Sequence, residues 1–397
     1  MITACIGLSW GDEGKGKISD LLASENDYIV RYSGGANAGH TIVVEGQKYK
    51  FHHLPCGSFA KNKPTLVLSN GMVINPITLS EEIRSLPSSE TTINISEKAH
   101  CVMPWHIASD TKKGSKIGTT GKGIGPCYAD KMHRSYAIRA GNLLEALKEE
   151  KTKRFFASDA ALHGEGLWKQ YYEAAQYLDK HLWDTGKLLR NAIKNKRNIL
   201  FEGAQGIQLD IDHSSCFPFC TSSGVGPAAI PQACGLPNLH LDRIIGVTKC
   251  YWTRVGHGPF RTEMNQQEMD FNPKYTNEIY NSKLEKTLGD EIRKLGNEFG
   301  TTTGRPRRIG WMDMPILKES LELSGATEIA LMHCDTITKF NNLIYIFDGK
   351  NYIEFNPWGS AAQNNFQIFK RYIEENTGLP VTITSWGPDR EETIFHA

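Results

Sequence analysis

Seven short apolar runs, each five to nine residues long, recur along this chain of 397 residues. A run that is apolar on both faces is typical of a buried strand in a parallel sheet, which helices cover on both sides. Several of the runs end in Gly-rich or polar loops, where open α/β sheets bind ligands. We therefore predict an α/β fold with a large, mainly parallel twisted sheet flanked by helices. The runs are ITACIGL (2–8), YIVRY (28–32), TLVLS (65–69), NILFE (198–202), IIGVTKCYW (244–252), EIALMH (328–333) and VTITS (381–385).

Helical periodicity replaces these runs between residues 143 and 195, which predicts a helical insertion. A last helix is predicted near the end of the chain, stopping at Gly378 before Pro380. No repeat, low-complexity tract or Pro/Gly/Ser-rich linker divides the sequence, so we predict one domain over 1–397. The predicted apolar helical faces consist of Leu143, Leu144 and Leu147; of Trp168, Tyr171, Tyr172, Ala175 and Leu178; and of Phe366, Phe369 and Ile373.

Charge and cysteine content exclude several classes of protein. Lys plus Arg (45) nearly equals Asp plus Glu (44), so no general attraction to nucleic acid or an anionic membrane is expected. No apolar run reaches the length of a membrane span, and the N-terminus MITACIGLSW has no basic signal-peptide region. The nine cysteines form no C-x-x-C pair, which indicates reduced thiols rather than a zinc site. A cytoplasmic protein without nucleic-acid or membrane partners is predicted.

The segment GDEGKGK (11–17) matches G-x-x-x-x-G-K, whose backbone N–H groups bind phosphates. It follows the first predicted strand and precedes a helical stretch, as that motif requires. Ile18 stands where a nucleotide-hydrolysing loop has a Ser or Thr for magnesium, and Asp12 and Glu13 add acids inside the loop. A Gly-rich turn with solvated charges would also fit the bare match. Three Gly, two Lys and two acids in seven positions favour a ligand site.

A second Gly-rich loop, GGANAGHT (34–41), follows the second predicted strand and displays Asn37, His40 and Thr41. A single His is more often structural than catalytic, but its place in a Gly-rich loop makes either role equally plausible. Together the loops offer a base, an acid or electrostatic helper, and phosphate-binding amines. We interpret this set as suited to phosphoryl transfer to an acceptor that itself loses a proton. The set is Asp12, His40, Lys15 and Lys17.

These two loops resemble those of the adenylosuccinate synthetase family, and six further segments continue the resemblance in order along nearly the whole chain. The resemblance implies a P-loop-like GTP-binding architecture with helical insertions. It also implies GTP-dependent ligation of IMP and L-aspartate to adenylosuccinate, GDP and phosphate through 6-phosphoryl-IMP, the first committed step from IMP to AMP. The segments are IGTTGKGIGPCYADK (117–131), FEGAQG (201–206), LDIDH (209–213), TRVGHGPF (253–260), NEFGTTTGRPRR (297–308) and SWGPDREET (385–393).

The resemblance also implies a role for individual residues. Asp12 corresponds to the base and to a magnesium ligand, the Gly39 carbonyl to a second Mg²⁺ ligand, and His40 and Lys15 to residues at the reacting groups. The implied IMP-binding residues are Asp12, Glu13, Lys15, Asn37, Ala38, Gly39, His40, Thr120, Arg134, Gln205, Thr221 and Arg305. The implied GTP-binding residues are Gly11, Asp12, Glu13, Gly14, Lys15, Gly16, Lys17, Gly39, His40, Thr41, Arg307, His333, Asp335, Ser385 and Gly387. The implied aspartate-binding residues are Thr301, Thr302, Thr303, Gly304 and Arg305.

Arg134 corresponds to an arginine that reaches the IMP phosphate across a homodimer interface, although by itself it would be interpreted as a surface arginine. Thr120 and Gln205 could equally stabilise their own loops. Asp335 can accept both N1–H and N2–H of guanine, which adenine cannot offer. The family has Lys where this chain has His333, so guanine recognition departs from the family pattern. Pro306 interrupts the family's run of arginines and predicts a stiffer loop.

Three alternatives to this function remain at the level of sequence. A related synthetase could aminate a 2-aminopurine nucleotide such as dGMP, with ATP as donor; Asp12 favours the IMP enzyme. A GTP-dependent regulatory switch lacks the loop hydroxyl that Ile18 replaces. Nucleic-acid binding rests only on the cluster Arg305, Arg307 and Arg308, which the balanced net charge opposes.

Overall fold

A ten-stranded sheet forms the centre of the computed structural model, which describes residues 1–44, 47–86, 91–113, 117–158, 164–264, 282–300, 304, 306–359 and 363–396. Its pairs are parallel except for the last one, between β18 and β19. The α/β class and the mainly parallel sheet are therefore confirmed. In spatial order the strands are β19 (Thr393–Phe395), β18 (Val381–Ser385), β15 (Glu328–Met332), β11 (Arg243–Lys249), β1 (Ile2–Gly7), β10 (Ile199–Gly206), β2 (Tyr28–Arg31), β5 (Thr65–Leu68), β7 (Ile93–Ser96) and β9 (Leu182–Trp183).

Each of the seven predicted runs overlaps a strand of this sheet. The run 244–252 is interrupted, because β11 ends at Lys249 and a new strand, β12 (Trp252–Arg254), pairs with β13 (Arg308–Gly310) in a separate sheet. Three further small sheets contain the remaining strands. They are β3 (His40–Val44) with β4 (Gln47–Phe51), β6 (Val73–Ile74) with β8 (His100–Cys101), and β14 (Met312–Asp313) with β16 (Ile344–Phe347), which also pairs with β17 (Tyr352–Phe355).

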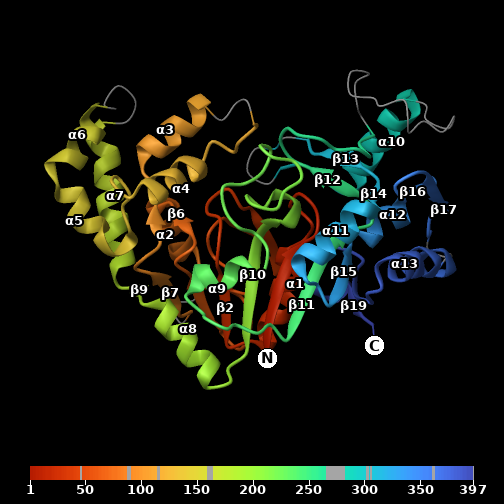
Figure 1. The fold of residues 1–397 in the computed structure, drawn as a ribbon, viewed down its shortest axis with the longest axis horizontal. Helices are drawn as coiled ribbons and strands as arrows, with labels where there is room; N and C mark the ends of the chain where they lie inside the picture. The colour runs from red at the N-terminus through yellow and green to blue at the C-terminus, as the bar shows by residue number, and fades with distance from the viewer. Residues whose placement is uncertain are drawn as a thin grey trace.

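Helices cover both faces of the sheet, with the N-terminal strand in the middle (Figure 1). Alternate residues of β1 enter different cores, Cys5 on the face of α1, α2 and α7 and Ala4 and Ile6 on the face of α8 and α9. This burial on both faces explains the uninterrupted apolar runs. The helices are α1 (Lys15–Leu22), α2 (Pro76–Ser85), α3 (Pro104–Lys113), α4 (Ile124–His133), α5 (Leu143–Lys148), α6 (Glu150–Ser158), α7 (Gly164–Asp179), α8 (Thr185–Lys194), α9 (Ala229–Cys234), α10 (Ser282–Leu295), α11 (Met314–Ser324), α12 (Cys334–Lys339) and α13 (Gln363–Thr377).

The segment 143–195 is helical but not throughout, because β9 interrupts it and joins the sheet beside β7. The predicted faces are otherwise confirmed: α5, α7 and α13 turn them toward the interior. Their fully buried members are Leu143, Leu147, Tyr171, Ala175, Leu178, Phe366, Phe369 and Ile373.

Local signals fix the helix ends. The Asn75 side chain accepts a hydrogen bond from Thr78 N at 3.1 Å and so caps α2, which begins with Pro76. Asp313 caps α11 in the same way, and Gly325 ends it in the left-handed conformation.

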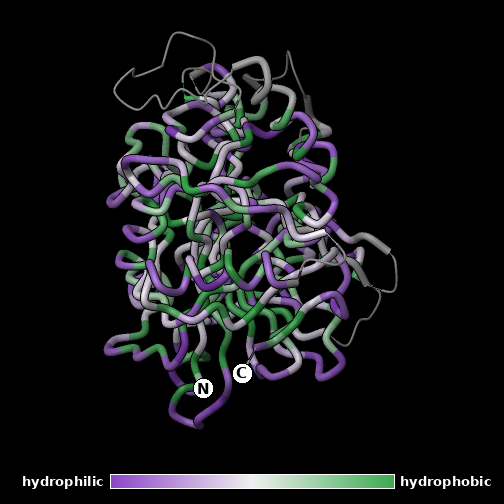
Figure 2. The backbone as a smooth tube through the Cα atoms, turned by 90° about the vertical axis from the view of Figure 1, so that its right-hand side faces the viewer, coloured by the Kyte–Doolittle hydropathy of each residue, from purple (hydrophilic) through white to green (hydrophobic). Residues whose placement is uncertain are grey.

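Apolar residues follow the interior strands, and polar residues dominate the outer turns (Figure 2). Among the described residues, no helix has both the length and the apolar character that crossing a membrane requires. All nine cysteines are free thiols.

Candidate active site

The parallel strands end at one edge of the sheet, and a cavity of about 840 Å³ lies there. This is where an open α/β sheet binds its ligands, and the volume suits a small-molecule site. Most of the predicted site residues that the structure describes line this cavity. They are Gly11, Asp12, Glu13, Gly14, Lys15, Gly16, Lys17, Asn37, Ala38, Gly39, Thr120, Gln205, Thr221, Arg307, His333, Asp335, Ser385 and Gly387.

The loop after β1 turns through three residues with positive φ, namely Gly11 (91°), Asp12 (60°) and Gly14 (94°). Glycine adopts this conformation freely, whereas for Asp12 the Cβ atom makes the left-handed conformation less favourable. Non-glycine residues with such backbone angles cluster at functional sites. The conformation sets Asp12 at the cavity with its side chain 29% exposed.

Glu13 fixes the loop from the inside. Its Oε1 accepts hydrogen bonds from Ser9 N at 3.1 Å, Ser9 Oγ at 2.9 Å and Gly11 N at 2.8 Å. Its Oε2 lies 2.6 Å from Lys15 Nζ, and both side chains are buried. Burial alone would raise the pKa of Glu13, but the Lys15 ammonium and the hydrogen bonds hold that pKa below its ordinary value. Both carboxylate oxygens of Glu13 are therefore occupied by neighbouring residues, which gives this acid a structural role in the loop.

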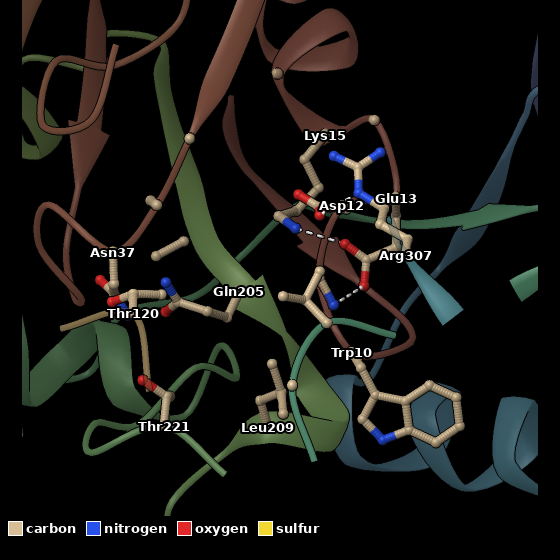
Figure 3. A pocket seen from close by; sticks show the side chains of 18 of the residues that line it. Trp10, Asp12, Glu13, Lys15, Asn37, Thr120, Gln205, Leu209, Thr221 and Arg307 are labelled. Atoms are coloured by element: carbon tan, nitrogen blue, oxygen red, sulfur yellow. Dashed lines mark hydrogen bonds and ion pairs between the residues drawn. The ribbon is translucent and has the colours of Figure 1, made fainter. Parts of the chain in front are cut away.

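Asp12 belongs to a chain of charged groups that the sequence did not reveal, of which Figure 3 shows Asp12 and Arg307. Arg307 Nε lies 2.7 Å from Asp12 Oδ2, and Arg307 NH1 lies 2.5 Å from Glu298 Oε2. Buried Glu298 also accepts from Lys249 Nζ at 2.9 Å and from Tyr251 Oη at 2.7 Å. Burial would raise the pKa of Glu298, but Lys249 and the other nearby cations hold it far below its ordinary value.

Polar side chains gather on the other side of the cavity. Figure 3 shows Asn37, Thr120 and Gln205 close together, with Thr221 nearby. Gln205 is at the end of β10 and only 8% exposed, yet neither of its amide atoms has a hydrogen-bond partner within the described residues. A buried amide without partners is costly unless a ligand or water supplies them.

A third group of residues connects the phosphate loop to the C-terminal strands. Lys17 Nζ donates to Ser385 Oγ at 2.8 Å and to the Gly387 carbonyl at 2.7 Å. Burial lowers the pKa of Lys17 to about 8. Asp335, in the first turn of α12, pairs with Lys339 Nζ at 3.1 Å.

The remaining predicted residues either do not line the cavity or cannot be placed. Arg134 is exposed at the end of α4 and does not line the cavity of its own chain. Gly304 is exposed and is also not among the lining residues. His40 and Thr41 are described only as the start of β3. Thr301, Thr302, Thr303 and Arg305 lie outside the described residues.

Sequence reasoning missed Glu298, Lys249 and Tyr251 as site residues. Glu298 stands within NEFGTTTGRPRR, directly before the threonines, and this position was the available signal. No local signal marks the other two, because their contacts to Glu298 span 49 and 47 residues.

Comparison with known proteins gives a consistent result. Residues 4–359 match the family model for adenylosuccinate synthetase. Curated adenylosuccinate synthetases from Shouchella clausii and Geobacillus sp. are 36% and 37% identical, each over 98% of this chain and 97% of the relative. The fully ligated adenylosuccinate synthetase structure from Plasmodium falciparum has a TM-score of 0.84 and 30% identity, covering 100% of this chain and 99% of that one. The cyanophage S-2L succinoaminodeoxyadenylate synthetase, bound to dGMP and dATP, shares the fold at a TM-score of 0.67 and 21% identity, over 99% of this chain and 95% of that one.

Proposed function

Because this chain belongs to the adenylosuccinate synthetase family, we propose that it ligates IMP and L-aspartate with GTP as the phosphoryl donor. One observation carries the proposal for this site. A phosphate loop presents an acid, Asp12, to the same cavity into which the unpartnered amide of Gln205 opens.

The proposed reaction begins with removal of a proton from the base of IMP. The C6 oxygen of hypoxanthine leaves poorly as oxide, so it is first phosphorylated. Asp12 takes the N1 proton, and the O6 oxyanion attacks the γ-phosphorus of GTP as the bond to the GDP oxygen breaks. The aspartate amine then attacks C6, loses a proton and displaces phosphate. His40 is proposed to stabilise the transferring phosphoryl group.

The contacts around Asp12 support its role as a base. Arg307 Nε lies 2.7 Å from Asp12 Oδ2 and so holds the carboxylate in place at the cavity. Glu13 and Lys15 neutralise each other and lock the loop, so that its backbone N–H groups can face phosphate.

The polar group opposite suits IMP. Asn37, Thr120 and Thr221 from three loops and Gln205 from the end of β10 offer amides and hydroxyls. The amide of Gln205 has donor and acceptor capacity to spare. Arg307 serves the nucleotide phosphates, and Thr301, Thr302, Thr303 and Arg305 serve the aspartate carboxylates.

Magnesium fits the oxygen donors at the loop. Asp12 offers a carboxylate and Gly39 a carbonyl, both at the cavity. The described residues contain no cluster of three acids, histidines or cysteines that could hold an ion by themselves. This donor set suits Mg²⁺, which commonly takes one or two protein ligands and completes its shell with phosphate oxygens and water. When bound, the ion would neutralise charge on the phosphates.

A homodimer is part of the proposal. Arg134 is exposed and does not line the cavity of its own chain, and Met132 (73% exposed) and Tyr136 (56% exposed) flank it in sequence. Exposed apolar side chains next to an arginine are typical of an interface. We infer that Arg134 completes the IMP site of a second copy, in a cytoplasmic enzyme.

The test is an absorbance assay for adenylosuccinate with purified protein, GTP, Mg²⁺, IMP and aspartate, leaving out each component in turn. Product is expected only in the complete mixture, and Asp12→Asn should abolish turnover while IMP binding persists. Activity of Asp12→Asn within a few-fold of the unmutated protein would refute the role of Asp12.

A second candidate is amination of dGMP with ATP, favoured only by His333 in the position of the family's lysine. Substituting dGMP and ATP in the same assay tests it. A higher rate with these substrates than with IMP and GTP would overturn the main proposal.

A further inference from the structure

His333 occupies an unusual position at the edge of the cavity. It lies between β15 and α12 with φ of 60°, and its side chain is 28% exposed. Its Nδ1 faces the interior, 3.1 Å from Tyr251 Oη and 3.3 Å from Thr336 Oγ1. Nδ1 therefore belongs to a hydrogen-bond network, and His333 is one of the residues that line the cavity.

The network determines which nitrogen carries the proton. Tyr251 has one hydroxyl hydrogen, and Glu298 Oε1, 2.7 Å away, can only accept because its carboxylate is ionised. The hydroxyl hydrogen is therefore directed at Glu298, which leaves oxygen lone pairs toward His333. The nearer oxygen, Tyr251 Oη at 3.1 Å, can therefore only accept from Nδ1, and the Thr336 hydroxyl oxygen at 3.3 Å can also accept, so the hydrogen is placed on Nδ1.

Neutral imidazole has only one N–H, so Nε2 is left with a lone pair. Burial lowers the pKa of His333 to about 4, which keeps the ring neutral near pH 7. Within the described residues Nε2 has no hydrogen-bond partner, and it is not among the atoms buried without one. It is thus an acceptor that a ligand in the cavity can reach.

We propose that His333 determines base specificity: its Nε2, kept unprotonated by the Tyr251–Glu298 hydrogen bonds, accepts a hydrogen bond from the amino group of the nucleotide base. The inference rests on the proposed function, which places the base of GTP at Asp335. A lysine at this position would present N–H donors, so the two residues make opposite demands on the ligand.

The number of acceptors matches guanine. Guanine presents three hydrogens on N1 and its 2-amino group; Asp335 has two carboxylate oxygens, and Nε2 supplies a third acceptor. Hypoxanthine has the N1 hydrogen but no amino group. Inosine triphosphate therefore tests the acceptor without changing the rest of the nucleotide.

The proton position can be measured without any ligand. In protein labelled with ¹⁵N in the histidine rings, the His333 signals are assigned by their loss in His333→Gln. A protonated Nδ1 and an unprotonated Nε2 are expected from their ¹⁵N chemical shifts. A protonated Nε2 in the unmutated protein would overturn the inference and leave the proposed function intact.

Binding provides the second test. GTP and ITP are titrated calorimetrically into the unmutated protein and into His333→Phe, which keeps an aromatic ring but removes the acceptor. The preference for GTP should fall about two- to tenfold in His333→Phe, the effect of one hydrogen bond. An unchanged preference would mean that the ring only stacks on the base, which refutes the inference.

Two further variants separate the network from the ring. Tyr251→Phe removes the nearer oxygen facing Nδ1–H, at 3.1 Å against 3.3 Å for Thr336 Oγ1, and should move part of the proton density to Nε2 in the ¹⁵N spectrum, with a smaller GTP preference. Thr336→Val is the matched control and should change neither, because Tyr251 remains. If neither nucleotide binds the unmutated protein, the proposed function itself fails.

Discussion

Replacing Glu298 with glutamine should destabilise the protein severely. Glu298 is fully buried and faces two cations, Lys249 and Arg307, as well as the Tyr251 hydroxyl. Glutamine keeps the size of the side chain but removes the negative charge. Both Glu298 oxygens accept hydrogen bonds, so the NH₂ group of a glutamine would face a donor at one of the two positions.

The magnitude follows from the cations left behind. Breaking a buried ion pair by removing one partner costs about 3–5 kcal/mol, because the other charge stays desolvated. Domains have only about 5–15 kcal/mol of total stability. Glu298→Gln should therefore lose a large part of the free energy of unfolding, and Glu298→Gln/Lys249→Met should regain some of it because one buried cation is gone.

Urea unfolding of the three proteins at pH 7 measures these differences. Glu97→Gln is the control, since the Glu97 pair with Lys98 is 3.6 Å long and exposed, and its loss should cost less than about 1 kcal/mol.

The pKa of Glu298 is held below its ordinary value of 4.5, so its stabilisation is complete above that pH and is lost as the pH falls toward the folded pKa. The difference in free energy of unfolding between the unmutated protein and Glu298→Gln should therefore become smaller below pH 4.5. A loss under about 1 kcal/mol at pH 7 would refute the assignment of Glu298 as the counter-ion of both cations.

Three further predictions concern the substrates. Arg134→Leu and Asp12→Asn should each be nearly inactive alone, but mixing them should restore activity through heterodimers with one intact site; no recovery despite verified subunit exchange would refute a shared site. Asp335→Asn should sharply reduce the ratio of kcat/KM for GTP over ATP, because an amide cannot accept two N–H groups; an unchanged ratio would move guanine recognition elsewhere. GTP affinity of the free protein should fall as the pH rises through about 8, where Lys17 loses its charge, and Lys17→Met should bind weakly at every pH; a pH dependence that survives in Lys17→Met would assign it to another group.

The strands could be predicted because burial on both faces leaves a local pattern, as in the run ITACIGL. Two-residue β9 leaves no such pattern and lies in a helical region, so only its pairing with β7 identifies it as a strand. In the candidate site, the position of Asp12 follows from the loop motif. The structural role of Glu13 does not, since a carboxylate beside Lys15 suits a ligand as well as an internal ion pair.

The other features of the site could not be predicted because the residues that contact each other are far apart in the sequence. Nothing near His333 indicates a fixed tautomer, because Tyr251 lies 82 residues away and owes its own orientation to Glu298. The threonines 301–303 and Arg305 were identified by resemblance alone, and their role stays a prediction.

The position of β1 in the sheet has a consequence for synthesis on the ribosome. Its two neighbours are β10 and β11, so Ile2 pairs with Ile199 and Thr3 with Arg243. At about 5–20 residues per second, β1 has neither neighbour complete for roughly 10–40 s after its own synthesis. The loop of residues 11–17 therefore cannot take its native shape until more than half of the chain has been made. During that interval β1 exposes apolar residues that a chaperone can bind, and the cavity is incomplete until Ser385 and Gly387 have been made.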